Sequence, residues 1–522
     1  MLNYKIINHF NIYCFGLVLL VVSLPFSVYM MSVSQFILAI NWLLEGRFIK
    51  KFQILKERKS ILLLICVYIV HVLGLLYTSN YDYAFHDLRI KAPLFILPLI
   101  IGTSQPLCFK HFKILILFLV AAVTVNSFIS ILVLMGYTNY EIHEVRNISI
   151  FISHIRYSLL INIAIFSLAY FIAKKGIIKY KAEKYFYLIC GIWLIVFLFI
   201  LQSLTGIAVF FITSFLILGY LVIRYRNIKY KIAVYTLWLL LPLSVFLYLR
   251  RSYCDFYDIK EENPEKLEKY TSQGNLYYHD YQNKHIENGN YIWLYLCEKE
   301  LREEWNKISE YKYDGKDKMG QDIKNVLIRY LTSKGLRKDA DGMAQLNNED
   351  VKAIEDGIAN HLFRKRMSLY QRIYKIIWQI DVYFKGGNPK GHSITQRLEY
   401  LKTSMQIIKD NIWIGVGTGD VQASFNEYYE KMGSQLTGKW RRRAHNQFIT
   451  FTITFGVAGV LLILFFLFYP IILEKQRKDY FLWVFLVIAL LSMINEDTLE
   501  TQAGVTFFTF FYSLLLLGRA RE

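Results

Sequence analysis

The sequence has few of the residue groupings that mark metalloenzymes or ATP-driven proteins. Its six cysteines include no Cys-x-x-Cys pair, and no histidines stand at a spacing suited to zinc. No pair of carboxylates has the ordinary spacing of a divalent metal site, and no Gly-Lys-Ser/Thr loop indicates ATP hydrolysis. We therefore expect no metal and no other cofactor, so that any group transfer would draw its energy from an activated donor.

The sequence also gives little sign of disulfide bonds or of a cleaved signal peptide. Four cysteines lie in or beside apolar segments, where a thiol behaves as a small hydrophobic side chain: Cys14, Cys66, Cys108 and Cys190. This leaves Cys254 and Cys297 as the candidate disulfide pair. No small-residue cleavage site follows the first apolar block, which leads straight into a second, so we expect a retained helix and no signal peptide.

Apolar residues are abundant instead, and they come in blocks. Of the 522 residues 55% are apolar and 16% aromatic, which is far too apolar for an ordinary soluble protein and indicates a polytopic membrane protein. The formal net charge is +19, but Lys and Arg recur in short clusters between the apolar blocks. That distribution is typical of residues that orient a chain in the membrane, and it argues against nucleic-acid binding.

Twelve of the apolar blocks approach the length of a membrane span, which needs roughly 20 mostly apolar residues. They lie near 9–27, 29–45, 60–77, 92–103, 114–136, 155–173, 185–202, 204–223, 232–249, 446–469, 480–495 and 502–518. The fourth is short. We therefore predict an all-α protein, a polytopic transmembrane helical bundle of about twelve spans.

The basic clusters between these blocks agree on one orientation. If the N-terminus is cytoplasmic, all four clusters fall on the cytoplasmic side, as expected for Lys and Arg: 47–59, 174–184, 224–231 and 475–478. The C-terminal Arg519 and Arg521 then also lie inside. The segments expected outside are 78–91, 137–154 and the turns near 203 and 498.

One long segment leaves the membrane between the ninth and tenth spans, on the outer face. The predicted parts are thus 1–249 (nine spans), 250–445 (a large, mainly helical periplasmic segment) and 446–522 (three spans). Apolar residues recur every three to four positions over 351–382 and predict an amphipathic helix there. A second helix is expected over 395–409, ending at a glycine-rich break, 415–420. This break follows a helix, so it is no dinucleotide fingerprint.

Charge and hydrocarbon meet at the start of the tenth span, where Arg441-Arg-Arg-Ala-His445-Asn446 precedes an apolar run. A neutral imidazole at His445 could take a proton from an acceptor hydroxyl, because the pKa of histidine lies near neutrality. The alternative is a plain helix start, with Asn446 as its cap and His445 at the interface. The pair Gly456 and Gly459 is expected to serve close helix packing.

His445-Asn446, nine residues and then Gly456-Val-Ala-Gly459, at the end of a large outer loop, resembles the O-antigen ligase family. Its superfamily also contains O-antigen polymerases and bacterial protein O-oligosaccharyltransferases. The run from Gln396-Arg397 to the Gly415-Val-Gly turn looks like another segment of that family. The resemblance implies transfer of a glycan from a polyprenyl (undecaprenyl) diphosphate carrier to an acceptor on the periplasmic face of the inner membrane, without a metal.

The resemblance assigns Arg397 to the donor diphosphate and, with His445, to catalysis. A guanidinium forms two parallel charge-assisted hydrogen bonds to phosphate oxygens and keeps its proton; the alternative is a solvated arginine on an amphipathic helix. Arg443 could add to the diphosphate site, together with Arg441 and Arg442. Basic residues that flank a span more often contact lipid headgroups.

Arg156 is a further candidate for the donor diphosphate, because a charge at the outer end of the sixth span is costly unless it is paired or hydrated. Family members resemble this chain in having an arginine near that helix end, although a snorkelling interface arginine is as good an explanation. A second arginine, found in the family within Ser-Arg-Gly, is missing, since this chain has Ser203-Leu-Thr-Gly206. How the diphosphate is fully neutralised is therefore open.

The outer turn before the last span, Asn495-Glu-Asp-Thr-Leu-Glu500, brings three carboxylates to the same face as His445. Together with His445, the three carboxylates could orient an acceptor sugar or raise the basicity of the imidazole, and Glu496 and Glu500, with Asn446, are the named candidates for acceptor orientation. Short outer turns are, however, often acidic without any catalytic role.

The sequence therefore predicts an inner-membrane glycosyltransferase of the O-antigen ligase type, in lipopolysaccharide biosynthesis. Its expected partners are a polyprenyl-diphosphate-linked glycan, a lipid A-core or other glycan or protein acceptor, and membrane lipids, with no nucleic acid. Polymerase and protein glycosyltransferase stay open, because they share the donor chemistry and differ in the acceptor. A polysaccharide transporter or flippase is the rival of another class, although related halves and midplane charges are not evident.

Overall fold

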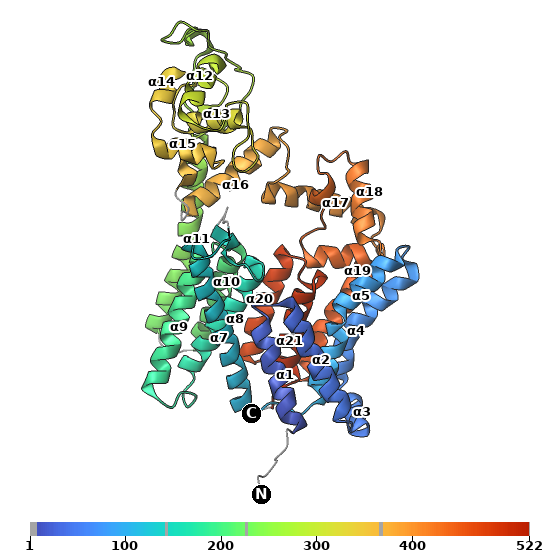
Figure 1. Ribbon diagram of the computed structural model, residues 1–522. Helices are drawn as coiled ribbons and strands as arrows, with labels where there is room; N and C mark the ends of the chain where they lie inside the picture. The colour runs from blue at the N-terminus through green and yellow to red at the C-terminus, as the bar shows by residue number, and fades with distance from the viewer. Residues whose placement is uncertain (1–7, 141–144, 225–227, 365–368, 521–522) are drawn as a thin grey trace. The chain divides into compact units, whose positions relative to one another are not determined.

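The computed structural model describes residues 8–140, 145–224, 228–364 and 369–520, and these are mainly helical (Figure 1). The predicted all-α class is confirmed for them, because the strands there are two antiparallel pieces of two residues each, β1 (Ile286–Glu287) and β2 (Asn290–Tyr291). The chain forms two compact units. Unit 1 is Met1–Arg224 with Gln396–Glu522, and unit 2 is Tyr225–Thr395.

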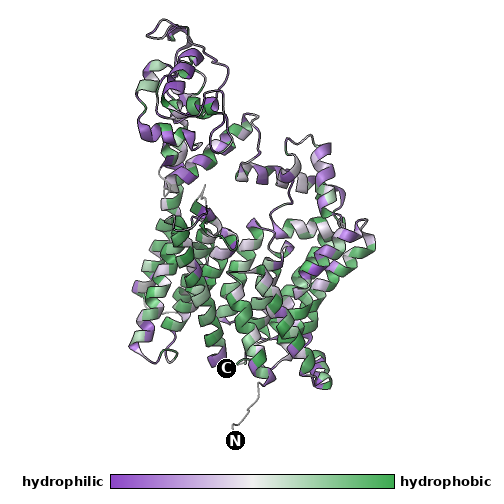
Figure 2. Cartoon of the chain, in the orientation of Figure 1, coloured by the Kyte–Doolittle hydropathy of each residue, from purple (hydrophilic) through white to green (hydrophobic). Residues whose placement is uncertain are grey.

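Unit 1 is a bundle of mostly apolar helices (Figure 2). Its first part contains α1 (His9–Ser23), α2 (Val28–Leu44), α3 (Phe48–Glu57), α4 (Lys59–Leu73), η1 (Gly74–Tyr77), α5 (Tyr81–Lys91), α6 (Pro93–Thr103), α7 (Phe109–Leu134), η2 (Val145–Ile148), α8 (His154–Ala173), α9 (Lys181–Ile200) and α10 (Leu204–Arg224). Its second part contains most of α17 (Ser393–Asp410), then α18 (Val421–Lys431), η5 (Gly438–Trp440), α19 (Gln447–Leu473), α20 (Tyr480–Asn495), η6 (Thr498–Glu500) and α21 (Gln502–Leu516).

Seven helices of the described chain are long and apolar enough to cross a membrane, or eight if α2 and α3, bent by 108° at their junction, count as one span. They are Lys59–Tyr77, Phe109–Leu134, His154–Ala173, Lys181–Ile200, Leu204–Val222, Lys231–Tyr257 and Gln447–Leu473. The other predicted spans are helices too, but they are short: α1 and α21 have 15 residues, α20 has 16 and α6 has 11. The count of twelve stays a prediction.

The core of unit 1 is built around α21. Every residue from Ala503 to Leu516 is buried, as expected for a helix that is apolar on all sides. Neighbouring helices contribute the rest of one continuous apolar cluster, in which Phe485 of α20 packs its ring against Phe507 and Phe511. The last helix of the chain is therefore central to the bundle.

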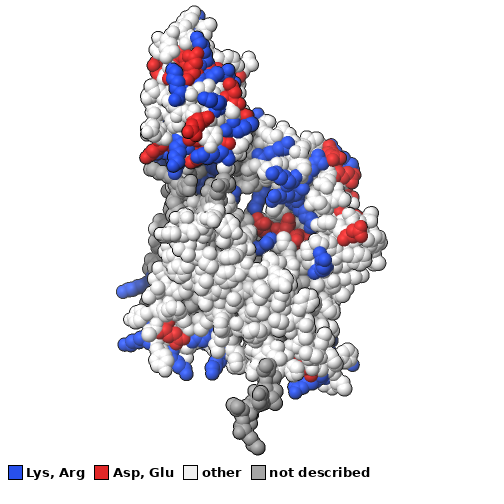
Figure 3. Space-filling model, viewed as in Figure 1, with Lys and Arg blue, Asp and Glu red and all other residues white. Residues whose placement is uncertain are grey.

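Polar contacts gather at the two ends of unit 1. At one end Arg58 donates to Glu474 at 2.9 Å and to the carbonyl of Leu517, which joins three segments assigned to the cytoplasmic side. At the other end Lys91 binds Glu500 at 2.9 Å, joining segments expected outside. Figure 3 shows a broad uncharged belt between the charged side chains of the two ends. Segments predicted to share a side of the membrane thus meet at the same end of the unit.

Unit 2 begins with a long helix and continues as short helices joined by polar loops. The helices are α11 (Ile228–Tyr257), η3 (Pro264–Lys266), α12 (Glu298–Ile308), α13 (Ile323–Ser333), α14 (Ala340–Ala344), α15 (Asn348–Glu355), η4 (His361–Arg364) and α16 (Leu369–Phe384). Its apolar core surrounds Trp305 and Tyr330, both fully buried. All six cysteines of the chain are free, so Cys254 and Cys297 form no disulfide here.

The single amphipathic helix predicted over 351–382 is wrong. Helix α15 ends at Glu355, since Gly357 adopts φ +79° and the amide of Ile358 donates back to the carbonyl of Ala353, which is a Schellman ending. The helix resumes as α16 only at Leu369, and residues 365–368 lie outside the described chain. The helix predicted over 395–409 is confirmed as α17.

Candidate functional site

Arg397 lies in the second turn of α17 and is bound to the turn that follows α20. One terminal nitrogen, Nη2, donates to Oε1 of Glu496 at 2.8 Å, and the other, Nη1, donates to the side-chain oxygen of Asn495. Its side chain is 31% exposed. Arg397 is therefore held in place by a carboxylate while part of its guanidinium stays open to solvent.

His445 lies directly before α19 in a left-handed backbone conformation, with φ 51°. Its amide donates to Oδ2 of Asp497 at 3.0 Å, and its ring stacks on Tyr400 of α17 with the ring centroids 5.5 Å apart. The ring nitrogen Nδ1 lies 3.5 Å from Oε2 of Glu496, within ion-pair range but long for a hydrogen bond. The imidazole is thus fixed on two sides.

Glu496 links the two residues that the sequence marks as catalytic. Its Oε1 accepts from Arg397, and its Oε2 faces His445. Burial alone would raise the pKa of Glu496, but contact with His445 and the charges of Arg397 and Arg156 outweigh burial and lower it. Glu496 is therefore a carboxylate at neutral pH, and Figure 3 shows Asp and Glu side chains gathered beside Lys and Arg side chains at this end of unit 1.

Asp497 is a residue of the site that sequence reasoning did not single out. Its Oδ2 accepts the amide of His445, and its Oδ1 accepts the hydroxyl of Thr450 at 2.7 Å. Burial raises the pKa of Asp497, while the pKa of its neighbour Glu496 is lowered. The sequence does show the acidic run 495–500. Nothing in that run, however, indicates that Asp497 binds the backbone of His445 while Glu496 faces its side chain.

Asn446 is the N-cap of α19. Its side-chain oxygen accepts the amide of Ile449 at 3.1 Å, and its amide group donates to the carbonyl of Ile494 at 2.8 Å. Both ends of the side chain are thus used to start the helix and to join it to α20. Its expected role toward an acceptor sugar stays a prediction.

Arg443 and Glu500 form a buried ion pair beside this centre. Nη1 of Arg443 lies 2.7 Å from Oε2 of Glu500, which also binds Lys91 at 2.9 Å, and Lys91 in turn binds Asp87 at 2.6 Å. Arg443 also donates to the hydroxyl of Tyr83. Burial alone would raise the pKa of Glu500, but Lys91 and Arg443 lower it far below its usual range. In this structure Arg443 is engaged by protein groups, and its predicted contact with phosphate stays untested.

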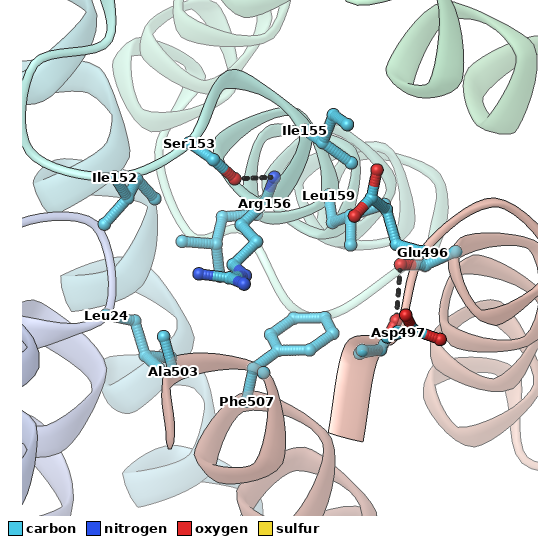
Figure 4. Close-up of a pocket in the computed structure, with 14 residues that line it drawn as sticks. Leu24, Ile152, Ser153, Ile155, Arg156, Leu159, Glu496, Asp497, Ala503 and Phe507 are labelled. Atoms are coloured by element: carbon cyan, nitrogen blue, oxygen red, sulfur yellow. Dashed lines mark hydrogen bonds between the residues drawn. The ribbon is translucent and has the colours of Figure 1, made fainter. Parts of the chain in front are cut away.

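Arg156 lies in the first turn of α8, where the hydroxyl of Ser153 caps its backbone amide. Its guanidinium points into a pocket between Leu24 and Phe507 and makes no hydrogen bond or ion pair with the residues that the structure describes (Figure 4). Glu496 and Asp497 line the same pocket. Arg156 therefore shares a pocket with Glu496, the carboxylate that contacts Arg397 and faces His445.

The turn that lacks the family's second arginine reaches the same group. Thr205 accepts a hydrogen bond of 2.6 Å from the side chain of Asn495, which itself accepts from Arg397. Ser203 donates to Ser158 of α8 at 3.1 Å. In place of an arginine, this chain has hydroxyl groups that tie the turn to α8 and α20.

Residues 412–419, which follow α17, bond to the backbone of α19 at its break; we call this segment the clip. The helix breaks at Gly456, with φ 64° and ψ −174°, a conformation that is essentially restricted to glycine. The carbonyls of Ile453 and Thr454, freed by the break, accept from the amides of Val416 and Gly417 at 2.8 and 2.9 Å. The amide of Val457 donates to the carbonyl of Ile412 at 2.8 Å. The glycine-rich break after α17 thus satisfies the backbone groups exposed by the kink.

The glycines of this clip allow backbone to touch backbone. A Cβ on Gly456 would lie 2.2 Å from the carbonyl carbon of Trp413, and one on Gly415 would lie 2.4 Å from that of Thr454. Gly456 therefore packs against a loop and not, as expected, against a helix. The same loop is fixed to the end of α4, because Thr418 donates to the carbonyl of His71 at 2.7 Å.

The arrangement suits the transfer of a group away from an anionic leaving group. It combines a partly exposed guanidinium, an unpaired guanidinium in an adjacent pocket, and an imidazole whose Nδ1 faces a carboxylate. Arginines can neutralise a phosphate, and an imidazole oriented by a carboxylate can take up a proton. Within the described residues no group of three or more His, Cys, Asp or Glu side chains is placed to hold a metal ion.

The comparison with known families agrees with the resemblance. Residues 357–464 match a family model described as O-antigen ligase. The matched segment contains Arg397, His445, Asn446 and the clip, whereas Arg156 and the turn with Glu496 and Glu500 lie outside it. No curated protein matches the chain.

Proposed function

From the O-antigen ligase segment at residues 357–464 we propose that this chain is an inner-membrane glycosyltransferase. It transfers a glycan from a polyprenyl diphosphate carrier to an acceptor hydroxyl on the periplasmic face, and the acceptor is lipid A-core. The observation that carries the proposal is the shared carboxylate: Glu496 contacts Arg397 through one oxygen and faces His445 through the other.

The donor diphosphate binds between Arg397 and Arg156. The guanidinium of Arg397 has further N–H groups beyond those that bind Asn495 and Glu496, and a guanidinium matches two phosphate oxygens at once. Arg156 offers its whole guanidinium, in a pocket whose other walls include Leu24 and Phe507. Few waters would compete inside this pocket, so Arg156 stabilises the developing charge on the leaving diphosphate more than it would in bulk water.

His445 receives the proton of the acceptor. Its Nδ1 faces Glu496, so its Nε2 is the nitrogen that is left to accept. The acceptor oxygen forms a bond to the anomeric carbon of the glycan, and the bond from that carbon to the phosphate oxygen breaks. The electron pair leaves with the polyprenyl diphosphate, and the hydroxyl proton passes to Nε2 of His445.

Purified protein in proteoliposomes, supplied with a polyprenyl-diphosphate glycan and lipid A-core, tests the proposal. Wild type should form the lipid A-core conjugate, and His445→Ala should abolish it. His445→Asn should abolish it too, although asparagine tolerates the left-handed backbone at this position far better than alanine. The exposed His86→Ala is the matched control and should keep full activity.

The outcome also separates the rivals. A longer glycan that stays on the carrier would indicate a polymerase, and glycan attached to protein would indicate a protein O-oligosaccharyltransferase. Movement of the intact carrier-linked glycan across the bilayer without conjugation would favour a flippase. Unchanged conjugation by both His445 variants would contradict the role of the imidazole.

A further inference from the structure

The outer surface of the clip carries three exposed apolar side chains in a row. Ile412 is 43% exposed, Trp413 73% and Ile414 62%. No residue from Ile412 to Gly419 is charged. Exposing a tryptophan and two isoleucines to water is unfavourable in free energy. We therefore expect an apolar partner to cover this surface.

The clip lies at the level where membrane helices end. Its Thr418 and Gly419 bond to His71 and Thr78, at the end of the span Lys59–Tyr77. On its other side Ile412 bonds to Val457 of α19. From Val457 the helix continues to Leu473 without a charged residue, and its side chains at Leu461 and Leu462 are 62% and 49% exposed. The apolar triplet therefore continues the surface of a membrane span.

Part of the backbone of the clip has the internal hydrogen-bond partners that an apolar environment requires. Irregular backbone is tolerated at membrane depth only where its polar groups find partners within the protein. Here the amides of Gly415, Val416 and Gly417 donate to carbonyls of Asn411, Ile453 and Thr454. The carbonyl of Ile412 accepts the amide of Val457.

We propose that Ile412, Trp413 and Ile414 insert into the bilayer at its interface and bind lipid acyl chains. Tryptophan favours this boundary, because its ring is apolar and its N–H reaches the headgroup level. The clip is bonded directly to both halves of α19, so the inserted triplet fixes the depth of the half-helix that starts beside His445. It also anchors the end of α17, the helix that carries Arg397.

Site-directed spin labelling in proteoliposomes of phosphatidylethanolamine and phosphatidylglycerol tests this insertion. The six native cysteines are replaced, and single cysteines are introduced as Trp413→Cys, Leu461→Cys and Lys409→Cys for labelling. Lys409 is exposed and lies one turn before the triplet, so it serves as the water-facing control. Leu461 serves as the lipid-facing control. The measurement compares collisions of each label with oxygen, which concentrates in lipid, and with a nickel chelate, which stays in water.

The label at 413 should resemble that at 461, with oxygen collisions exceeding nickel collisions several-fold, and the label at 409 should show the reverse. A label at 413 that behaves as at 409 would overturn the proposal. A label at 413 that neither reagent reaches would also overturn it, because protein, such as a second copy of the chain, would then cover the triplet. If Trp413→Cys does not insert, Ile414→Cys carries the same test.

Discussion

At the scale of single residues, the Arg397–Glu496–His445 group depends on one carboxylate that contacts a permanent cation with one oxygen and faces an imidazole with the other. Glu496 accepts a hydrogen bond from the permanently charged Arg397 and faces the titratable His445. Its neighbour Asp497 accepts the backbone amide of His445 and forms no ion pair with a Lys or Arg among the described residues. Two adjacent carboxylates thus divide the work: one fixes where the imidazole stands, and the other sets the charge beside it.

Glu496→Gln is expected to change how stability depends on pH. Because the folded pKa of Glu496 is lowered from its ordinary 4.5, the ionised form adds stability above pH 4.5, and this is lost as pH falls through the folded pKa. Glu496→Gln should therefore melt at a lower temperature than wild type near neutrality, with a difference that shrinks below pH 4.5. Thermal unfolding followed by intrinsic fluorescence measures this.

Glu427→Gln is the matched control, since Glu427 pairs with Lys431 on the surface with both side chains 58% exposed. Such pairs contribute little, so this variant should follow wild type at every pH. A constant difference between Glu496→Gln and wild type over the whole range would mean that the carboxylate charge at 496 does not stabilise the fold.

Arg397→Lys should lower the rate of transfer while the protein still inserts in the membrane. Lysine keeps the charge but loses the two-pronged fork, and one lost charge-assisted hydrogen bond of about 1.5–3 kcal/mol corresponds to a rate about 10- to 150-fold lower. Steady-state conjugation in proteoliposomes measures it. Arg302→Lys, at an exposed pair with Asp314, should keep wild-type activity. If Arg397→Lys and Arg302→Lys had equal rates, the guanidinium of Arg397 would have no specific role in transfer.

Local sequence predicted some of these residues and not others, for a physical reason. Arg397 and His445 stand out because each lies within a recognisable run, and Glu496 because it is a charge in a short turn. The pairing of Arg443 with Glu500 depends on Lys91 and Tyr83, which are hundreds of positions away in the chain. Such contacts arise only when α5 and η6 pack together, and no local pattern encodes that packing.

At the scale of elements, the clip explains how α17 and α19 keep Arg397 and His445 in register. The two helices meet at one end where Tyr400 stacks on His445, and at the other where the loop 412–417 bonds to 453–457. Attachment at both ends fixes the relative rotation of the two segments better than either contact alone. The spacing of Arg397 and His445 is therefore set by backbone geometry as well as by side chains.

Gly456→Ala should destabilise the protein and lower its activity together. The new Cβ would meet the Trp413 backbone at 2.2 Å, and alanine would have to hold φ 64°. Gly433→Ala is the control, because Gly433 has φ 60° but open space around it, so it bears only the roughly 1–2 kcal/mol cost of the left-handed backbone. Melting temperature and conjugation rate measure both. A Gly456→Ala protein as stable as Gly433→Ala would mean that the clip can shift to accommodate a Cβ at position 456 at little cost in stability.

Hydrophobic periodicity predicted elements of this chain well and their ends less well. The pattern over 395–409 became α17, since no glycine interrupts it. The pattern over 351–382 is as regular, yet it runs across Gly357, where a Schellman ending turns the chain. Periodicity reports which face is apolar, and it continues across a break when both helices bury the same kind of side chain.

At the scale of the whole molecule, the charge rule predicts that the two polar ends of unit 1 lie on opposite sides of a membrane. The amide of Leu107 donates to the carbonyl of Gly518 at 2.7 Å, which places Cys108 at the end that holds the C-terminus. His445 and Glu500 lie at the other end, with Lys91. The charge rule assigns the first end to the cytoplasm and the second to the periplasm, where the proposed donor and acceptor are found.

Two native cysteines allow this orientation to be measured. Cys108 and Cys254 are both exposed, and the charge-derived topology puts Cys108 inside and Cys254 outside. In variants that keep only one cysteine, a membrane-impermeant maleimide should modify Cys254 in intact spheroplasts and Cys108 only after lysis, with the cysteine-free protein as the blank. Labelling of Cys108 in intact spheroplasts would mean that the orientation is the reverse of the one predicted. It would place His445 on the cytoplasmic face, away from a periplasmic donor, and so would contradict the proposed reaction as well as the topology.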